Sequence, residues 1–217
     1  SFEEVCVLHP HKLQLGFLKF LPGAPIQNLV ERHGYQFQST PPYEFISNAD
    51  LSAHEVIYLK KLEEVFDLFY NSKRFRFSIQ QLLRKYSPVA IFDNLLEHME
   101  LKDIINQSHS LDDQYQILHD TFSLGADPAT LDLLRLDYLY AQRVYRLPRF
   151  LQIQGSKQKT WQGDRKTPLV PFQHQICIHA GEVEVIPASS TQYCAVVHTE
   201  GSSGYLRPPT LEWVSDI

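Results

Sequence analysis

Two cysteines and two histidines near the carboxyl end of the chain are the residues best suited to bind a metal. Cys177 and His179 are two residues apart, and Cys194 and His198 are four apart, so each pair points to one face of a predicted strand. Two thiolates and two imidazoles form the ligand set of a structural zinc site. Cys-x-His is not a usual zinc spacing, however, and half-buried strand residues are the simpler interpretation. We expect no metal here and keep zinc as the lesser alternative.

The cysteine count and the charge exclude several classes of protein. The third cysteine, Cys6, is far from the other two, and three widely spaced cysteines are a poor disulfide framework. We therefore expect reduced, partly buried thiols in a cytoplasmic protein. A formal charge of -5 argues against a general nucleic-acid binder, which needs a basic surface. No apolar run approaches the ~20 residues that span a bilayer, so we expect no membrane partner.

The remaining polar and aromatic residues have simple structural explanations. Cations near the end of one predicted helix suit its dipole, with a phosphate site as the alternative: Arg135, Arg143, Arg146 and Arg149. An aromatic run at helical spacing is more simply core than a substrate or partner groove: Phe66, Phe69, Tyr70, Phe75 and Phe77. The sequence has no Ser-His-Asp arrangement, phosphate loop or dinucleotide fingerprint. We expect no catalytic residue in this chain.

The stretch from Leu13 to Ile26 organises the first part of the chain. An apolar strand is predicted from His11 or Lys12 to about Phe20, after a short helix that Pro10 ends. Pro22, Gly23 and Pro25 stop the strand, and a helical pattern follows from Ile26 to His33, with Gly34 in its C-cap position. Helix, strand, turn and helix is the order of an α/β unit with a covered sheet. Almost nothing before the strand could cover it, so we expect the chain to be part of a larger protein.

A block of about five helices is predicted from Leu51 to Arg146. It follows a proline-rich linker, Thr40 to Tyr43. Ser52 and Glu55 form a capping box, and Ser87-Pro88 and Asp127-Pro128 place a cap residue before a proline. The predicted helices run from 52 to about 71, from 78 to about 86, from 88 to about 99, from 111 to 122 and from 128 to about 144. Ser110 is the predicted cap of the fourth. The last should bury one stripe: Leu131, Leu134, Tyr138, Ala141 and Tyr145.

The carboxyl end changes to a period of two, which is typical of strands. A polar loop is expected over 155–168, followed by short strands at 172–179, 182–186 and 192–199. A further strand at the edge of the sheet is expected near 205–213. Ala180-Gly181 should form a hairpin turn and Pro187 to Ser190 a looser one. The predicted fold class is α+β, mainly α, with three parts: a βα remnant (1–40), a helical bundle (41–150) and a β tail (151–217).

The first two thirds of the chain also resemble a known family. The sequence is similar to the carboxy-terminal part of cobalamin-binding radical S-adenosylmethionine proteins, in which a partial α/β barrel precedes a helical domain of unassigned function. Five segments carry the resemblance: Leu13-Gln14-Leu15-Gly16-Phe17-Leu18-Lys19, Pro22-Gly23-Ala24-Pro25-Ile26, Pro42-Tyr43-Glu44, Leu51-Ser52 and Tyr70-Asn71-Ser72-Lys73-Arg74-Phe75. It covers Ser1 to about Arg149.

The resemblance implies a site at the end of a barrel strand and cofactors held elsewhere. Barrel active sites lie at the carboxyl ends of strands, which points to Lys19 and Gly23, with Gln14 and Gly16 one or two layers below. A parent of this family would bind an iron–sulfur cluster, S-adenosylmethionine and possibly cobalamin. The family holds its cluster with Cys-x-x-x-Cys-x-x-Cys, which this chain lacks. We therefore expect no cofactor in this chain.

Two hypotheses for function follow. In the first, the chain is the non-catalytic carboxy-terminal region of an iron–sulfur oxidoreductase of the radical S-adenosylmethionine type. Its partners are the rest of the parent chain and an unknown substrate, and its helical domain closes the barrel or contacts that substrate. In the alternative, the chain is a helical module that binds a protein or peptide and has no enzymatic role. An exposed apolar face beside residues 13–20 would favour the first.

Overall fold

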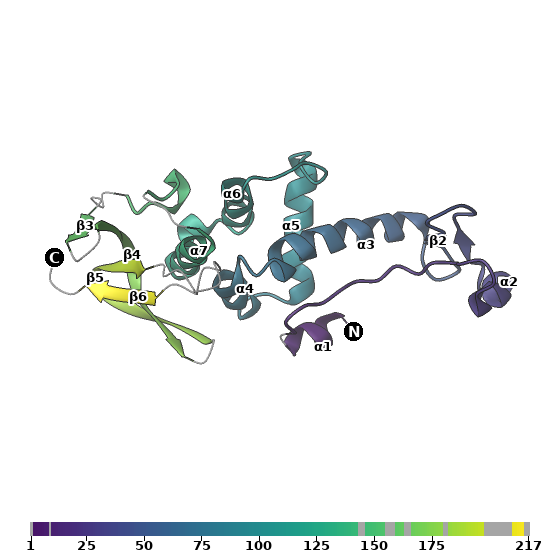
Figure 1. Ribbon diagram of the computed structural model, residues 1–217, viewed down its shortest axis with the longest axis horizontal. Helices are drawn as coiled ribbons and strands as arrows, with labels where there is room; N and C mark the ends of the chain where they lie inside the picture. Colours follow the sequence, from purple (N-terminus) through teal and green to yellow (C-terminus); the bar gives the residue numbers. More distant parts are fainter. Residues whose placement is uncertain are drawn as a thin grey trace. The chain divides into compact units, whose positions relative to one another are not determined.

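The computed structural model describes residues 2–8, 10–142, 146–154, 159–162, 166–179, 182–197 and 210–214 (Figure 1). These residues are mainly helical and add two small antiparallel sheets, which confirms the predicted α+β, mainly α class. The chain divides into two compact units, Ser1–Asn71 and Ser72–Ile217. The predicted three-part division stays a prediction. Within the described ranges, no helix combines the length and apolar character that crossing a bilayer requires.

The longest helix of the first unit is α3 (Ala53–Phe66), and the other elements of the unit are short. Its elements are α1 (Phe2–Val7), η1 (Pro25–Leu29), α2 (Val30–His33), β1 (Gln36–Phe37), β2 (Phe45–Ser47), α3 (Ala53–Phe66) and η2 (Asp67–Asn71). As predicted, Gly34 ends α2 in the left-handed conformation, with φ of 63°. η2 has π-helical hydrogen bonding and extends α3 to Asn71, where the sequence places the end of the helix.

Two predictions in the first unit are wrong. The expected strand over residues 11–20 is extended but joins no sheet, and its one bridge pairs Lys19 with Glu44. A strand needs a neighbouring strand along its length, and β2 reaches only the end of this segment. The expected linker at Thr40 to Tyr43 is a turn between β1 and β2, closed by the Tyr43 amide on the Thr40 carbonyl at 2.9 Å.

The start of α3 is held by the predicted capping box. The Ser52 hydroxyl accepts from the Glu55 amide at 3.2 Å, and the Glu55 carboxylate accepts from the Ser52 amide at 2.8 Å. The hydrogen bonds that the Ser52 amide and hydroxyl donate to the Glu55 carboxylate lower the pKa of Glu55.

Ser52→Ala removes the hydroxyl cap and should lower the free energy of unfolding of the first unit by about 1 kcal/mol. Hydrogen exchange of the first turn of α3 measures the effect. Ser52→Thr, which keeps the hydroxyl, should stay close to the unmodified chain, and equal loss in both variants would contradict the capping role.

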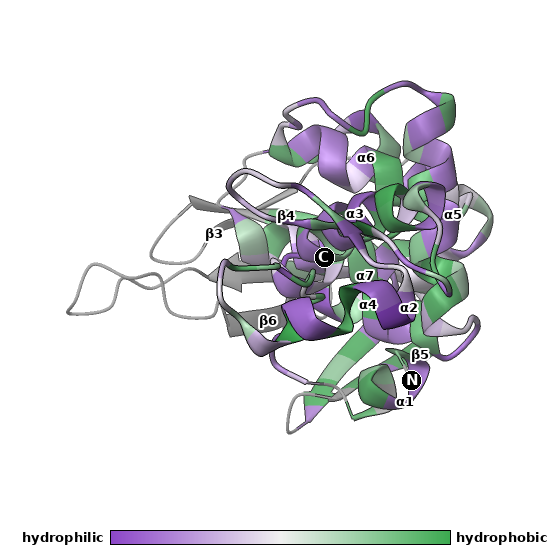
Figure 2. Ribbon diagram, turned by 90° about the vertical axis from the view of Figure 1, so that its right-hand side faces the viewer, coloured by the Kyte–Doolittle hydropathy of each residue, from purple (hydrophilic) through white to green (hydrophobic). Residues whose placement is uncertain are grey.

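The second unit begins with four helices and short helical turns. They are α4 (Arg76–Leu83), α5 (Pro88–Leu101), α6 (Leu111–Thr121), η3 (Leu124–Ala126), α7 (Pro128–Ala141) and η4 (Arg149–Leu151). Ser87, Ser110 and Asp127 cap α5, α6 and α7 as the sequence predicts. Figure 2 shows hydrophobic and hydrophilic residues interleaved along these helices.

Helix α7 is the centre of the second unit, and its predicted single stripe is wrong. Every residue from Thr130 to Leu139 is buried, including two aspartates and an arginine: Asp132, Arg135 and Asp137. Helix α4 and strand β4 (Lys166–His179) both contact α7, with α6 and η3 beside them. The prediction that Arg135 is a cation at the helix end is also wrong, because this residue lies in the buried middle of α7.

The carboxyl end forms a sheet in the order β3-β4-β5-β6, with β3 at Lys159–Gln162, β5 at Glu182–Val197 and β6 at Thr210–Val214. Strands β4 and β5 pair as far as His179 and Glu182, and the predicted turn at Ala180-Gly181 lies outside the described residues. The predicted turn at Pro187 to Ser190 is replaced by a continuation of β5, whose register with β4 jumps from Gln192 to Pro187. The expected loop at 155–168 instead contributes β3 and the start of β4. Strand β6, at the edge of the sheet, confirms the predicted edge strand over residues 210–213, and residues 205–209 lie outside the described ranges.

Candidate functional site

Residues 13–21, which we call the edge segment, run beside α3 in the first unit (Figure 1). Asn71 holds one end: its side chain accepts from the Leu13 amide at 3.0 Å and donates to the Leu13 carbonyl at 2.7 Å. The turn before β2 holds the other end. The Phe20 amide donates to the Tyr43 carbonyl at 2.8 Å, and the Phe45 amide donates to the Leu18 carbonyl at 2.9 Å.

Between these anchors the edge segment has one covered side and one open side. Leu13, Leu15 and Phe17 are half-buried, whereas the residues between and after them, Gln14, Gly16 and Leu18, are exposed. This alternation is that of a strand with one buried face. Within the described part of the chain, residues 14–17 make no backbone–backbone hydrogen bond. The segment therefore offers unpaired backbone groups beside an exposed face.

Phe20 fixes the edge segment to the small core of the first unit. Its side chain is fully buried and packs in one cluster with Phe45 and Val56. Its ring stacks on Phe37 with 4.4 Å between centroids and lies 5.1 Å from the ring of Tyr35. Such aromatic contacts add to the free energy gained by burying the rings.

The structure brings two of the four sequence-predicted site residues together. Gln14 and Gly16 lie on the open side of the edge segment, and a side chain added at Gly16 would meet no atom within 4 Å. Lys19 is exposed beyond them, at the bridge with Glu44. Gly23 is exposed in the following turn with φ of 78°, which is why a glycine stands there.

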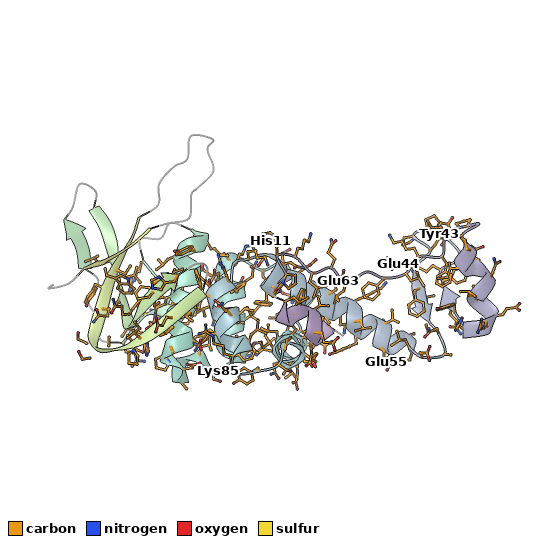
Figure 3. The ribbon with its side chains drawn as sticks, turned by 90° about the horizontal axis from the view of Figure 1, so that it is seen from below. His11, Tyr43, Glu44, Glu55, Glu63 and Lys85 are labelled. Atoms are coloured by element: carbon orange, nitrogen blue, oxygen red, sulfur yellow. The ribbon has the colours of Figure 1, made fainter. Side chains whose placement is uncertain are left out.

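Charged side chains of α3 border the edge segment. The Lys60 ammonium lies 2.5 Å from the Glu44 carboxylate and 5.5 Å from the ring centre of Phe17. The hydrogen bond from Lys60 holds the pKa of Glu44 below its usual value. Burial and the charge of Asp67 raise the pKa of Glu63. Figure 3 shows Glu63 on the side of α3 that faces the segment and Glu55 on the other side.

A buried ionic network in the second unit was missed by sequence reasoning. The Asp132 carboxylate pairs with the guanidinium of Arg135, and its other oxygen accepts from the Gln173 amide, the His174 amide and His174 Nδ1, each at 2.8 Å. Arg135 Nε donates to the carbonyl of Leu151 at 2.5 Å. The network thus fixes β4 and η4 to α7, at the point where the β4–β5 register is irregular.

The signal for this network was available in the sequence. Asp132, Arg135 and Asp137 interrupt a helix that carries leucines on every side. A helix that is apolar all round is buried, and charges within it must be paired or hydrogen-bonded.

Comparison with known proteins adds one finding. A family model described as a protein of unknown function, DUF4080, matches residues 31–168, more than half of the chain. The chain belongs to the DUF4080 family. No curated protein and no solved structure gives a significant match. The DUF4080 match includes all of α7, and it leaves out the edge segment, β5 and β6.

The cysteines and histidines that the sequence offers for zinc are not brought together in this DUF4080 protein. Cys177 lies opposite Glu184, and Cys194 lies opposite Val170, seven residues from Cys177 along β4. That separation is about 23 Å at ~3.3 Å per residue, far beyond the reach of one metal ion. His179 is at the hairpin with Cys177, and His198 lies outside the described residues. The zinc site stays a minor prediction without support from this geometry.

The thiols also do not fit the three-cysteine cluster site of radical S-adenosylmethionine proteins. Cys177 and Cys194 are separated along the sheet as described, and Cys6 is buried in α1 of the other unit. Burial, together with the charge of Glu3, raises the pKa of the Cys6 thiol to about 11, so it stays protonated near neutral pH. A cluster ligand is a thiolate from a local loop. We assign no cluster chemistry to this chain.

Proposed function

We propose that this chain is the carboxy-terminal region of a radical S-adenosylmethionine enzyme, in which the edge segment completes the barrel sheet of the parent protein. DUF4080 domains occur in radical S-adenosylmethionine and cobalamin proteins. The resemblance of residues 13–26 to a late barrel strand and its turn supports the same assignment. The parent would bind the iron–sulfur cluster, S-adenosylmethionine and possibly cobalamin, and this chain would supply no catalytic residue.

One observation carries the proposal: the edge segment is extended, unpaired over residues 14–17 and exposed on one side. Unpaired backbone groups of an extended segment are a template for strand addition. Leu18 and Leu21 are also exposed, and burying their side chains against a neighbouring strand or helix would favour the addition. The helical part that follows would then close the barrel or contact the substrate.

A second function has its own support. The far end of the edge segment is already bridged to Glu44, and Phe20 is covered by residues of the same unit. A segment that is covered within its own unit fits a helical module that binds a protein or peptide, with no enzymatic role. The two functions differ in what covers residues 14–17.

Hydrogen exchange distinguishes them. In this chain the amides of residues 14–17 should exchange at close to the rate of an open peptide. In the full-length parent, reconstituted with iron and sulfide, sheet pairing should slow them by about a hundredfold or more. Equal rates in the two proteins would reject the barrel assignment, as would a parent that fails to cleave S-adenosylmethionine reductively.

Gly16→Pro is the matching functional test. Proline removes a backbone donor and is excluded from central strands, but Gly16 is exposed with open space around it. The variant should leave the melting temperature of this chain within about 2 °C. It should lower reductive cleavage by the parent at least tenfold, while Gly16→Ala keeps activity. Unchanged cleavage in the proline variant would favour the interaction module.

A further inference from the structure

Asp137, in the buried middle of α7, accepts three hydrogen bonds from the start of α4. Its oxygens accept from the Phe77 amide at 3.0 Å, the Ser78 amide at 2.8 Å and the Ser78 hydroxyl at 2.6 Å. Helix α4 has no side-chain cap of its own, because its N-cap position is Phe75. Asp137 therefore acts as the missing cap from another helix.

The two buried aspartates of α7 differ in how their charge is balanced. Asp132 is paired with the guanidinium of Arg135, so its negative charge has a buried partner. The three groups that donate to Asp137 are uncharged: two amides and a hydroxyl. Among the described residues, no cation forms an ion pair with Asp137, and the charge of Arg76 acts on it only from outside hydrogen-bond contact. Burial of a carboxylate that has no paired cation favours its protonated form.

The structure can accommodate that proton without moving the backbone. The Ser78 hydroxyl oxygen lies 2.6 Å from the Asp137 carboxyl and also 3.3 Å from the Phe75 carbonyl. With Asp137 ionised, the hydroxyl donates to the carboxylate. With Asp137 neutral, the acid proton can point to the Ser78 oxygen, and the hydroxyl turns to donate to Phe75. Each protonation state thus has a complete set of partners.

We propose that Asp137 is a buried proton-binding site whose occupancy changes with pH near neutrality and sets the stability of the α4–α7 pair. It is independent of the edge segment and of any parent enzyme.

The surroundings of Asp137 agree with this assignment. Burial raises the pKa of Asp137 to about 7, against the lowering effect of the bonds from Ser78 and Phe77. The titratable or charged groups that face it are the exposed Arg76 on α4, Tyr115 on α6 and Tyr140 on α7. Both tyrosines are neutral at this pH, because burial raises their pKa values.

The sign of the effect follows from linkage. The folded pKa is above the unfolded value, so the native state binds a proton that the unfolded chain releases between about pH 4 and pH 7. The bound proton on Asp137 contributes its full stabilisation below about pH 4. This contribution falls as the pH rises and is lost above about pH 7. Over this window, each unit of increase in pH should raise the equilibrium constant for unfolding about tenfold, through the proton that Asp137 releases on unfolding.

Two measurements on the whole chain test the proposal. In the native protein, the carboxyl ¹³C resonance that disappears in Asp137→Asn should titrate near pH 7. In urea denaturation from pH 4.5 to 8, Asp137→Asn should lack the tenfold-per-unit component that the unmodified chain shows.

A midpoint below pH 5 for the Asp137 resonance would overturn the proposal. So would an Asp137→Asn variant with the pH dependence of the unmodified chain. If that variant does not fold, Ser78→Ala replaces it, because losing the hydroxyl donor should move the Asp137 midpoint upward. An unchanged or lower Asp137 midpoint in Ser78→Ala would also show that the Ser78 hydroxyl does not stabilise the ionised form of Asp137.

Discussion

Asp132→Ala should lower the free energy of unfolding of the second unit by about 3–5 kcal/mol, because it leaves a buried guanidinium without its counter-charge. Arg135 is 1% exposed and cannot reach water in the folded chain. The amides of Gln173 and His174 lose their acceptor at the same time. Urea denaturation can be followed by the fluorescence of Trp213, whose ring packs against Phe172 with centroids 5.6 Å apart.

A matched control separates this effect from the loss of any aspartate. Asp120 on α6 is 44% exposed and pairs with His119, so Asp120→Ala should cost less than about 1 kcal/mol. In the double variant Asp132→Ala/Arg135→Met, the stranded cation is gone, and part of the loss should be recovered. If Asp132→Ala costs no more than Asp120→Ala, the ion pair does not hold β4 to α7.

Phe20→Ala should destabilise the first unit by about 3–5 kcal/mol, because a fully buried ring is replaced by a cavity at the centre of the aromatic cluster. The same substitution removes the anchor at the end of the edge segment. Amide exchange over residues 35–47 should become more than about a hundredfold faster, since this stretch holds the ring partners of Phe20.

The neighbouring residue provides the control. Leu21 is 53% exposed, and Leu21→Ala should change exchange over the same residues by less than about threefold. Phe20→Leu keeps most of the volume and should fall between the two. Similar exchange in Phe20→Ala and Leu21→Ala would show that the edge segment is not anchored through this ring.

Local signals in the sequence were sufficient to place the starts of four helices, α3, α5, α6 and α7. Cap residues at Ser52, Ser87, Ser110 and Asp127 act within one turn, so each helix start could be predicted from three or four neighbouring residues. Gly34 marks the end of α2 for the same local reason. The strand pattern of the tail was also visible, although a proline at 187 suggested a turn where β5 continues.

The failures concern contacts between residues far apart in the chain. Residues 11–20 have the apolar pattern of a strand, but a strand forms only where another strand is available, and β2 is too short to pair with all of it. Arg135 looked like a helix-end cation, because the sequence does not show which elements pack around α7.

The sequence by itself therefore determined most helix starts, the mainly α class and the alternating burial of residues 13–18, because caps, periodicity and turn residues act over a few positions. Only the tertiary structure decided which groups become partners. It set Cys177 and Cys194 about 23 Å apart along β4, gave Asp132 a cation and left Asp137 with uncharged donors. Register and burial set these outcomes, and both depend on which distant segments meet when the chain folds.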